Sequence, residues 1–316
     1  MTCFGPVPSR RLGHSLGINN IPPKICTYSC VYCQMGTTIK MLIDRQPFYR
    51  PEVIFAAVQK RVEADTARGE PIDYLTFVSD GEPTLEVNLH RQIDLLRPLR
   101  IRTAVITNSS LCASGPVRED LVRADLVSLK VDAISEEVWR RLNRPHRQLN
   151  LDRILDSIVE FARNCNGEVI TETMLIAGVN DGEEELGRIA AFLTRVKPNR
   201  AYVAIPTRPP TEKWVQPASE ESINMAYQTF GEALGYDQVE YLVGYEGNAF
   251  ASSGDAEEDL LSITAVHPMR REAVAELLAR ASVGWEAVET LIEESKLVEL
   301  EYEGNRFYMR RLHTKR

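Results

Sequence analysis

Three cysteines lie within eight consecutive residues of this chain, at Cys26, Cys30 and Cys33. Their thiols can converge on one inorganic centre only if the backbone between them forms a tight, irregular loop, which the rest of the fold must hold in place. Thiolates are the ligands that iron–sulfur clusters and zinc prefer. The spacing also fits a redox-active dithiol at Cys30 and Cys33, so a dithiol and a zinc loop stay open beside a cluster.

The absence of a fourth ligand in the sequence favours a cluster. A structural zinc site is tetrahedral and normally takes its last ligands from a second Cys or His pair, and no such pair follows at a suitable spacing. A cubane cluster held by three cysteines leaves one iron without a protein ligand, and that iron can bind a small molecule. The sequence therefore favours a three-cysteine cluster with one open iron.

Length and composition limit the remaining possibilities. The chain has 316 residues, enough for one large domain and a small one. Its 37 basic and 45 acidic side chains argue against a general nucleic-acid coat or a membrane-surface protein. No run of about 18 apolar residues and no charged-then-apolar leader occurs, so we expect no membrane contact and a cytoplasmic location. The other cysteines, Cys3, Cys112 and Cys165, are expected to be packed or without a role.

Short β-branched segments alternate with amphipathic segments of helical length. Strands are predicted at residues 15–19, 73–78, 101–107, 125–131, 168–175, 200–205 and 239–243. Helices are predicted at 52–68, 86–98, 151–164, 182–196 and 218–233, with one more after Ser135. This alternation predicts a parallel sheet with helices outside, and six strand–helix units are too few for a closed eight-stranded barrel. We expect an α/β fold, a partial (β/α)6 TIM-type barrel, with ligands at the carboxyl ends of its strands.

Small and acidic residues break the alternation at 244–259, as a linker does. Two domains are therefore predicted, residues 1–254 and 255–316. A winged-helix pattern of three helices and a hairpin follows the linker, at 257–266, 270–281, 285–294, 296–302 and 306–311. Residues 256–316 hold 12 acidic and 9 basic side chains, and the third helix is acidic on its exposed side. These charges favour protein docking or a stabilising role over contact with nucleic acid.

Polar residues follow several predicted strands. Gly81-Glu82-Pro83 comes after the second strand, and Asn108 after the third. In the fourth strand, alternation places Ser128 and Lys130 on one face. A buried lysine is costly without an anion beside it. That anion is either a bound ligand or a carboxylate of the chain itself, Asp132 or Glu172.

The first 50 residues hold six basic side chains and one acidic one, although the whole chain is acidic. Part of this positive charge is expected to balance the negative charge of a cluster. Arg10, Arg11 and His14 precede the cysteine loop and are candidates for a cationic lip that binds a phosphate or carboxylate of the substrate. Arg144 and His146 are further candidates for this lip.

Two of these patterns together resemble a known family. The C-x3-C-x2-C spacing with Tyr32 before the last cysteine, followed by Gly81-Glu82-Pro83, resembles the radical S-adenosylmethionine (SAM) superfamily. The resemblance implies that Cys26, Cys30 and Cys33 hold a [4Fe-4S] cluster whose open iron chelates the methionine end of SAM. It also implies that an electron from a donor such as flavodoxin or ferredoxin cleaves SAM to a 5′-deoxyadenosyl radical, which abstracts hydrogen from a substrate.

The resemblance assigns six residues to cofactor binding. The glycine and glutamate of the Gly-Glu-Pro turn match the methionine amino group, the asparagine and serine at the next strand ends match the ribose, and the lysine matches the carboxylate. The cofactor-binding residues implied in this way are Tyr32, Gly81, Glu82, Asn108, Ser128 and Lys130.

Within the superfamily, residues 1–254 are most similar to the wyosine-synthase-like group, which remodels a guanosine in transfer RNA. The likeness rests on Gly5-Pro-Val-Pro-Ser-Arg-Arg11, Tyr28, Gln34-Met-Gly36 and Gly81-Glu-Pro-Thr84. The chain departs from that group in two ways: only Cys3 precedes the cluster motif, where wyosine synthases carry a further cysteine triad, and a winged-helix tail is added. One cluster is therefore predicted.

The leading hypothesis is an enzyme that makes an adenosyl radical and acts on a phosphate-bearing substrate such as an RNA nucleotide. A small-molecule or peptide substrate is the enzymatic alternative. The non-enzymatic alternative is an iron–sulfur electron carrier or sensor whose winged helix docks DNA.

Overall fold

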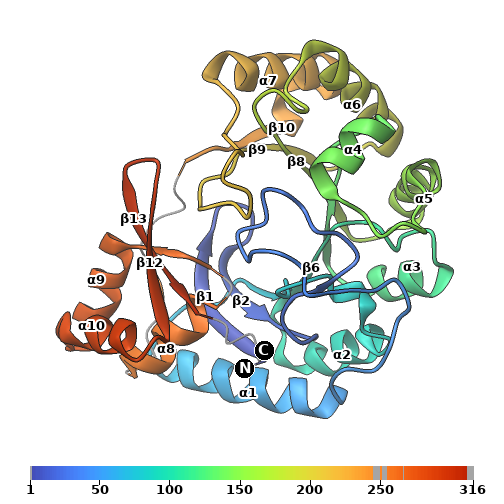
Figure 1. Ribbon diagram of the computed structural model, residues 1–316. Coiled ribbons are helices and arrows are strands. Elements are labelled where there is room, and N and C mark those ends of the chain that lie inside the picture. Colours follow the sequence, from blue (N-terminus) through green and yellow to red (C-terminus); the bar gives the residue numbers. More distant parts are fainter. Residues whose placement is uncertain (1, 245–249, 251–254, 266, 312–316) are drawn as a thin grey trace.

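The computed structural model describes residues 2–244, 250, 255–265 and 267–311. Its largest element is one eight-stranded sheet, in the order β1-β2-β5-β6-β7-β8-β9-β10, which curls into an open half-barrel (Figure 1). The strands from β2 to β10 are parallel to their neighbours, and β1 runs antiparallel to β2. The predicted partial barrel is confirmed. The strands are β1 Cys3–Ser9, β2 Gly13–Ile18, β5 Tyr74–Phe77, β6 Arg102–Thr107, β7 Leu126–Lys130, β8 Glu168–Met174, β9 Arg200–Ala204 and β10 Val239–Leu242.

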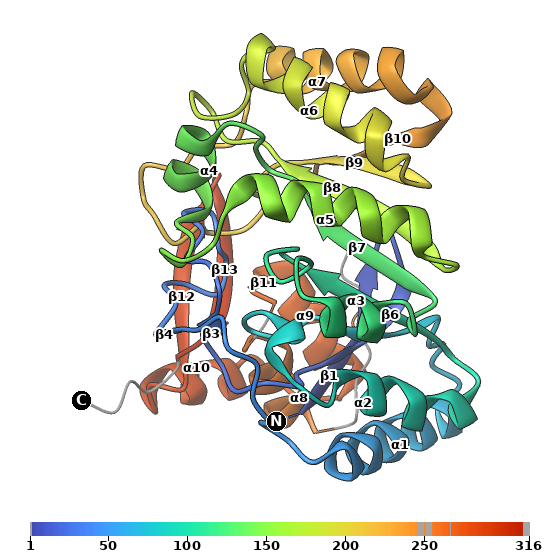
Figure 2. The ribbon, with the colours of Figure 1, turned by 90° about the vertical axis from the view of Figure 1, so that its right-hand side faces the viewer.

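Helices α1 to α7 surround the sheet on its outer side (Figure 2). They form because apolar residues recur every three or four positions; α5, for example, buries Leu151, Ile154, Ile158 and Phe161 against the core. Within the described ranges, no helix has both the length and the apolar character needed to cross a lipid bilayer. The helices are α1 Pro51–Ala67, α2 Leu89–Leu96, α3 Gly115–Leu121, α4 Glu136–Asn143, α5 Leu151–Asn164, α6 Glu183–Val196 and α7 Glu220–Leu234.

The side chains inside the barrel lie in layers. The layer at the amino ends of the strands is an apolar cluster, made of Leu12, Tyr74, Ala104, Leu126, Ile170 and Tyr202. Side chains two positions apart share one face of a strand, so Ser128 and Lys130 follow Leu126, and Glu172 follows Ile170. The apolar layer therefore fills the amino end of the barrel, and polar side chains face its carboxyl end.

Among the larger elements of the half-barrel, β1 and α3 were not predicted, and the two-residue strands β3 and β4 were not predicted either. Strand β1 was missed because Pro6 and Pro8 interrupt it, but an edge strand bonds to one neighbour only and tolerates proline. Helix α3 was missed because it has seven residues; Ser114 at its N-cap and Pro116 in its first turn are the start signals that could have revealed it. The helix expected at 86–98 is shorter, Leu89–Leu96.

The C-terminal segment has the element order of a winged helix. The three helices and the hairpin predicted from the sequence are present, and a short strand, β11, was not predicted. The hairpin and β11 form one sheet in the order β11-β13-β12. The predicted domain boundary at residue 254 lies outside the described residues, so the division into domains stays a prediction. The elements are α8 Ala256–Ile263, β11 Met269–Arg270, α9 Arg271–Arg280, α10 Glu286–Glu293, β12 Leu297–Tyr302 and β13 Asn305–Arg310.

This segment packs on β1 and α1. Phe4 and Val7 of β1 belong to the apolar cluster of the C-terminal helices and hairpin. The Arg61 guanidinium of α1 lies 3.0 Å from Asp65 and 3.4 Å from Asp259 of α8, and both carboxylates are at most 1% exposed. The segment is thereby held on the side of the half-barrel where β1 forms the edge of the sheet (Figure 1).

Candidate active site

The cysteine loop lies at the carboxyl end of the barrel, between β2 and α1. Cys26 ends the short strand β3 (Ile25–Cys26), which pairs with β4 (Lys40–Met41). On its other side, Ile25 is bridged to Gly81, and the Glu82 N–H donates to the Ile25 carbonyl at 3.2 Å. The loop is therefore joined to the Gly-Glu-Pro turn that follows β5.

Glycine is required at position 81 of this turn. The backbone of Gly81 has a φ of +149°, and a Cβ at this position would lie 2.0 Å from the Ile25 carbonyl oxygen. A side chain at this position would separate the two segments. The sequence identified Gly81 through the motif, and the structure gives the physical reason: close approach of two backbones.

The end of α4 holds the opposite side of the cysteine loop. The Ser29 N–H donates to the Asn143 carbonyl at 3.1 Å, and the Val31 N–H donates to the Leu142 carbonyl at 3.0 Å. The Tyr28 hydroxyl accepts a hydrogen bond from Trp139 Nε1 at 3.2 Å, and their rings meet edge to face with centroids 5.9 Å apart. The loop is thus clamped between the Gly-Glu-Pro turn and α4.

The chemistry of the three thiols fits an iron–sulfur centre. All three are free, and burial raises the pKa of Cys30 to about 12. Burial also raises the pKa of Cys26, where the charge of Glu82 adds to the effect, and the pKa of Cys33. Thiols with raised pKa values are protonated at neutral pH, so a positively charged centre is needed to stabilise their thiolate forms. Three free thiols on one clamped loop are a suitable donor set for a cluster.

The described residues contain no group of three or more His, Cys, Asp or Glu side chains gathered as around a single metal ion. In a cubane each thiolate binds a different iron, so the ligands lie farther apart than those of one ion.

Glu82 connects the turn to the end of β6. Its side chain is buried, and its carboxylate accepts hydrogen bonds from Thr84 N at 3.1 Å, Thr84 Oγ1 at 2.6 Å, Thr107 Oγ1 at 2.7 Å and Asn108 N at 2.8 Å. Burial raises the pKa of Glu82, and these hydrogen bonds oppose the shift. The recorded partners of the carboxylate are protein groups, and a contact of Glu82 with SAM stays a prediction.

A network of charges fills the polar part of the barrel. Lys130 Nζ lies 2.6 Å from Glu172 Oε1 and 3.9 Å from Asp132 Oδ1, so the internal ion pair that the sequence left open is formed. Arg11 contacts the other oxygen of Glu172 and donates to Ser128 Oγ at 3.3 Å. Burial alone raises the pKa of Glu172, but the two cations beside it outweigh burial and lower that pKa to about 2.

A second polar group links this network to the cysteine loop. Lys130 Nζ lies 5.0 Å from the centroid of the Tyr32 ring, and the Tyr32 hydroxyl donates to Asp132. Asn143 Nδ2 donates to the same carboxylate at 2.9 Å and lies 3.5 Å from Cys30 Sγ. The structure therefore brings together the cysteine loop and two of the predicted cofactor residues, Tyr32 and Lys130.

Asn108 lies at the other end of the loop. Its Nδ2 donates to Thr27 Oγ1 at 2.7 Å and lies 3.5 Å from Cys26 Sγ. Asn108 and Lys130 line one cavity of about 20 Å³ with Asp132. This cavity has room for about one water molecule, and it is also lined by Trp139 and by apolar residues of α5.

Two of the three predicted lip residues share a cavity. Arg10, Arg11 and Arg208 line a space of about 80 Å³ together with Glu172. Arg10 Nη1 also donates to the Val243 carbonyl after β10 at 2.6 Å. The cavity therefore lies where the β1–β2 turn meets the carboxyl ends of β8 to β10.

The other lip candidates lie elsewhere. His14 is 42% exposed and lies 3.1 Å from Asp73. Arg144 pairs with Glu212, and the His146 N–H donates to the Thr27 carbonyl at 2.9 Å. His14 and Arg144 are thus held by carboxylates outside the arginine cavity, while His146 supports the cysteine loop through its backbone.

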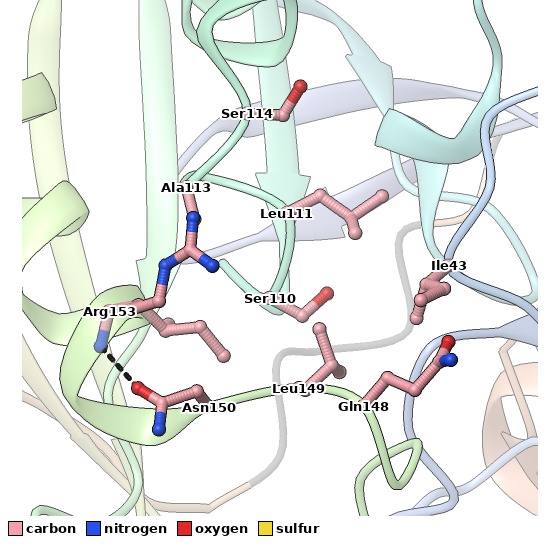
Figure 3. A pocket seen from close by; sticks show the side chains of 10 residues that line it. Ile43, Ser110, Leu111, Ala113, Ser114, Gln148, Leu149, Asn150 and Arg153 are labelled. Carbon is pink, nitrogen blue, oxygen red and sulfur yellow. Dashed lines mark hydrogen bonds between the residues drawn. The ribbon is translucent and has the colours of Figure 1, made fainter.

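A larger cavity, of about 260 Å³, opens beside the loop that follows β6 (Figure 3). Ser110 lines it, and the Ser110 hydroxyl also lies 2.7 Å from Thr27 Oγ1, next to Cys26. Of the residues that line this cavity, none belongs to the predicted cofactor-binding set. They are Ile43, Ser110, Leu111, Ala113, Ser114, Gln148, Leu149, Asn150, Arg153 and Ile154.

Sequence reasoning missed Trp139, Asn143 and Arg208. Each is far along the chain from the cysteines and belongs to no recognisable motif, because its role comes from contacts that only the fold creates. Glu172 was considered as a partner of Lys130, which is where the structure places it.

Comparisons with known proteins give a family. The radical SAM superfamily model matches residues 20–190 of the chain. The chain is 47% identical to a UPF0026 protein of Methanocaldococcus jannaschii, over 98% of this chain and 96% of that protein. It is 26% identical to the dual-specificity RNA methyltransferase RlmN of Ruegeria sp., over 54% of this chain and 45% of that protein.

The chain shares its fold with a solved structure. A radical SAM methyltransferase from Sphaerobacter thermophilus aligns with a TM-score of 0.55 and 18% identity, over 73% of this chain and 67% of that one. An archaeal TYW1 aligns with a TM-score of 0.48 and 14% identity, over 72% of this chain and 74% of that one.

Proposed function

The chain belongs to the radical SAM superfamily and to the UPF0026 family, and from this premise we propose that it reductively cleaves SAM at a [4Fe-4S] cluster held by Cys26, Cys30 and Cys33. Membership of the superfamily supports an enzyme over an electron carrier or a DNA-docking sensor. When bound, the cluster supplies the electron that breaks a carbon–sulfur bond of SAM, and the resulting 5′-deoxyadenosyl radical removes hydrogen from the substrate.

One observation carries the proposal: three free thiols occupy a single loop at the carboxyl end of the half-barrel, clamped by backbone hydrogen bonds on both sides. The clamp is the part of the work that the chain itself performs. It fixes the positions of the sulfur atoms, and the buried Tyr28–Trp139 pair keeps water from the underside of the loop.

Lys130 and Glu172 are proposed to admit SAM by changing partners. The Lys130 ammonium is paired with Glu172, so another carboxylate can bind it closely only if this pair opens. A carboxylate of SAM can take the place of Glu172 at Lys130, because Arg11 remains to neutralise Glu172. Ser128 and Asn108 are then proposed to contact the ribose.

Anaerobic reconstitution with iron and sulfide tests the proposed function. With dithionite and SAM, the protein is expected to release 5′-deoxyadenosine, and the Cys30→Ala variant is not. Cys165→Ala is the matched control and keeps the activity, because that cysteine lies far from the loop in sequence and follows α5. A protein with an intact cluster that releases no 5′-deoxyadenosine contradicts the proposal.

The proposed substrate is anionic, and a phosphate-bearing RNA nucleotide is the first candidate. Three arginines line the 80 Å³ cavity, and guanidinium groups bind phosphate in a bidentate way. The space is about four times that of the one-water cavity beside Asn108, which suits a phosphate or carboxylate group but not a whole nucleotide. The similarity to an RNA methyltransferase over half of the chain supports the RNA candidate.

Filter binding of short RNAs at several salt concentrations tests the substrate class. Phosphate-driven binding gives a negative slope of log affinity on log salt, and Arg10→Gln is expected to reduce that slope by about one. Arg102→Gln, which removes an exposed arginine at the amino end of β6, is the control. Binding without a salt slope would exclude a phosphate-driven contact and favour a small molecule or a peptide.

The electron donor is proposed to be a small carrier such as flavodoxin or ferredoxin, because the chemistry needs one electron from outside the chain. The C-terminal winged-helix segment is proposed to stabilise the edge of the half-barrel or to dock a protein, since its helix α10 begins with Glu286 and Glu289 and is poorly suited to a phosphate backbone.

A further inference from the structure

We propose that Asn143 is a positioning residue that donates a hydrogen bond from its side-chain amide to the Cys30 sulfur and thereby raises the reduction potential of the cluster. The inference rests on the proposed function, because it requires a cluster on Cys30. Asn143 is the last residue of α4 and is 3% exposed. Its Nδ2 lies 3.5 Å from Cys30 Sγ, within the range of an N–H···S hydrogen bond.

Asp132 fixes the orientation of the Asn143 amide. Asn143 Nδ2 lies 2.9 Å from Asp132 Oδ2, and both oxygens of this carboxylate accept hydrogen bonds, one from the Tyr32 hydroxyl and one from the Met174 N–H. The amide nitrogen, not the oxygen, must therefore face Asp132. The same nitrogen lies 3.4 Å from the Tyr32 hydroxyl, whose own hydrogen is donated to Asp132. One N–H of the amide is thus directed at Asp132, and the other faces the Tyr32 oxygen at 3.4 Å and Cys30 Sγ at 3.5 Å. A flipped amide would set its oxygen against the carboxylate.

Asp132 is itself held in place. Its Oδ1 accepts the Met174 N–H at 2.9 Å, and its backbone carbonyl accepts Asn180 Nδ2 at 2.8 Å. Asp132 is 4% exposed, so water does not compete strongly for its oxygen atoms. The carboxylate that orients Asn143 is therefore anchored to β8 and to the turn that follows β8.

The backbone keeps Asn143 close to Cys30. The residues on either side of Cys30 both donate backbone hydrogen bonds to the end of α4. The Ser29 N–H donates to the Asn143 carbonyl at 3.1 Å, and the Val31 N–H donates to the Leu142 carbonyl at 3.0 Å. Loading the loop with a cluster does not require these bonds to break, since they involve main-chain atoms. The amide therefore stays beside the sulfur in the loaded protein.

Hydrogen bonds to the sulfur ligands of an iron–sulfur cluster are one of the factors that set its potential. The added electron makes the sulfurs more negative, so a donor stabilises the reduced state more than the oxidised state. Asn108 has a similar place beside Cys26, but its amide makes a shorter bond, 2.7 Å, to Thr27 and it belongs to the predicted cofactor set. Asn143 is not among the residues predicted to bind SAM. A change in the cluster potential on replacing it can therefore be measured without the cofactor.

The test is a redox titration of the reconstituted protein without SAM, followed by electron paramagnetic resonance. Asn143→Leu keeps the size of the side chain and removes the donor, and the midpoint potential is expected to fall by about 59 mV, a tenfold change in the reduction equilibrium of a one-electron couple. Gln92→Leu is the control: it removes a buried amide of α2 that belongs neither to the cysteine loop nor to the group around Asp132, so no shift is expected.

The outcomes separate this inference from the proposed function. If the wild-type protein binds no cluster, the proposed function fails and Asn143 has nothing to act on. If the wild type and Asn143→Leu bind equal amounts of iron and have the same potential, the inference alone is overturned. If Asn143→Leu loses iron, the potential of Asn143→Ser is measured instead. The serine side chain is polar but too short for its hydroxyl to reach the Cys30 sulfur. Loss of iron in both variants, with retention in Gln92→Leu, makes Asn143 a purely structural residue and also overturns the inference.

Discussion

Glu172 balances the positive charge inside the barrel. Its carboxylate lies between Arg11 and Lys130 in the polar part of the barrel, and its side chain is 9% exposed. The two cations lower its pKa to about 2 against the effect of burial. A carboxylate whose pKa is lowered by folding stabilises the protein above its unfolded pKa of about 4.5, and this stabilisation is lost as the pH falls toward about 2.

Glu172→Gln is therefore expected to flatten the acid dependence of stability. The wild-type free energy of unfolding should fall by about 3 kcal/mol between about pH 5 and about pH 2 through this one group, and the variant should lack that part of the change. At pH 7 the variant should be less stable, because two buried cations lose their partner. Urea unfolding at several pH values measures both effects. Glu184→Gln, at an 83% exposed carboxylate, is the control, and equal acid slopes for the wild type and Glu172→Gln would contradict the account.

Tyr28 is the second residue whose replacement is expected to lower the free energy of unfolding. Its hydroxyl accepts the Trp139 N–H inside the core, so Tyr28→Phe leaves a buried donor without its partner. We expect a loss of about 1–3 kcal/mol in the free energy of unfolding, measured by urea titration. Tyr227→Phe removes an exposed hydroxyl with a 3.5 Å contact and should change the free energy little. A Tyr28→Phe protein as stable as the Tyr227→Phe control would show that the contact contributes nothing.

At the residue scale, the sequence predicted the residues that belong to short motifs, but not the residues whose role depends on contacts made by the fold. The cysteine triad and Gly81-Glu82-Pro83 were found in the sequence because their chemistry depends on residues close together in the chain. Asn143 and Trp139 were not found, because an asparagine or tryptophan in an amphipathic helix has many other uses. The lip of Arg10, Arg11 and His14 was divided by the fold, since alternation along the hairpin cannot show which side chains reach across the barrel.

At the scale of elements, the cysteine loop depends on the close contact between β3 and the Gly-Glu-Pro turn. Gly81→Ala would place a Cβ 2.0 Å from a backbone oxygen, which cannot move without opening the β3 bridge. We expect the variant to lose most of its iron after reconstitution while keeping its helical circular dichroism. Gly187→Ala, in a helix with no atom within 4 Å of the new Cβ, should bind iron normally and be slightly more stable, by about 0.5–1 kcal/mol. Full iron content in Gly81→Ala would contradict this role of the turn.

The helices and strands that the sequence predicted correctly are those with a clear pattern of apolar residues. Strands such as β6 and β8 are rich in apolar and β-branched residues, and α5 and α6 carry clear amphipathic patterns. Strand β1 and helix α3 are short or rich in proline, and their structure depends on neighbours: β1 on pairing with β2, and α3 on packing of Val117 and Leu121 against the core.

At the scale of the whole molecule, the C-terminal segment closes the edge of the half-barrel through a buried ion network. Asp259→Ala removes one of the two carboxylates at Arg61. We expect a loss of about 1–3 kcal/mol and faster hydrogen exchange in α8 and in β1, which share one apolar cluster. Glu257→Ala, in an exposed pair with Lys296, is the control and should leave exchange in β1 unchanged. Equal exchange in both variants would mean that the network does not hold the segment.

The central claim is that three cysteines leave one iron of the cluster open and that SAM takes this position. Mössbauer spectroscopy of the iron-57-reconstituted protein tests it most directly, because it resolves individual iron sites. Adding SAM is expected to change the signal of one iron in four and to leave the other three as they were. Four equivalent irons that do not respond to SAM, or a protein that binds zinc in place of iron, would contradict it.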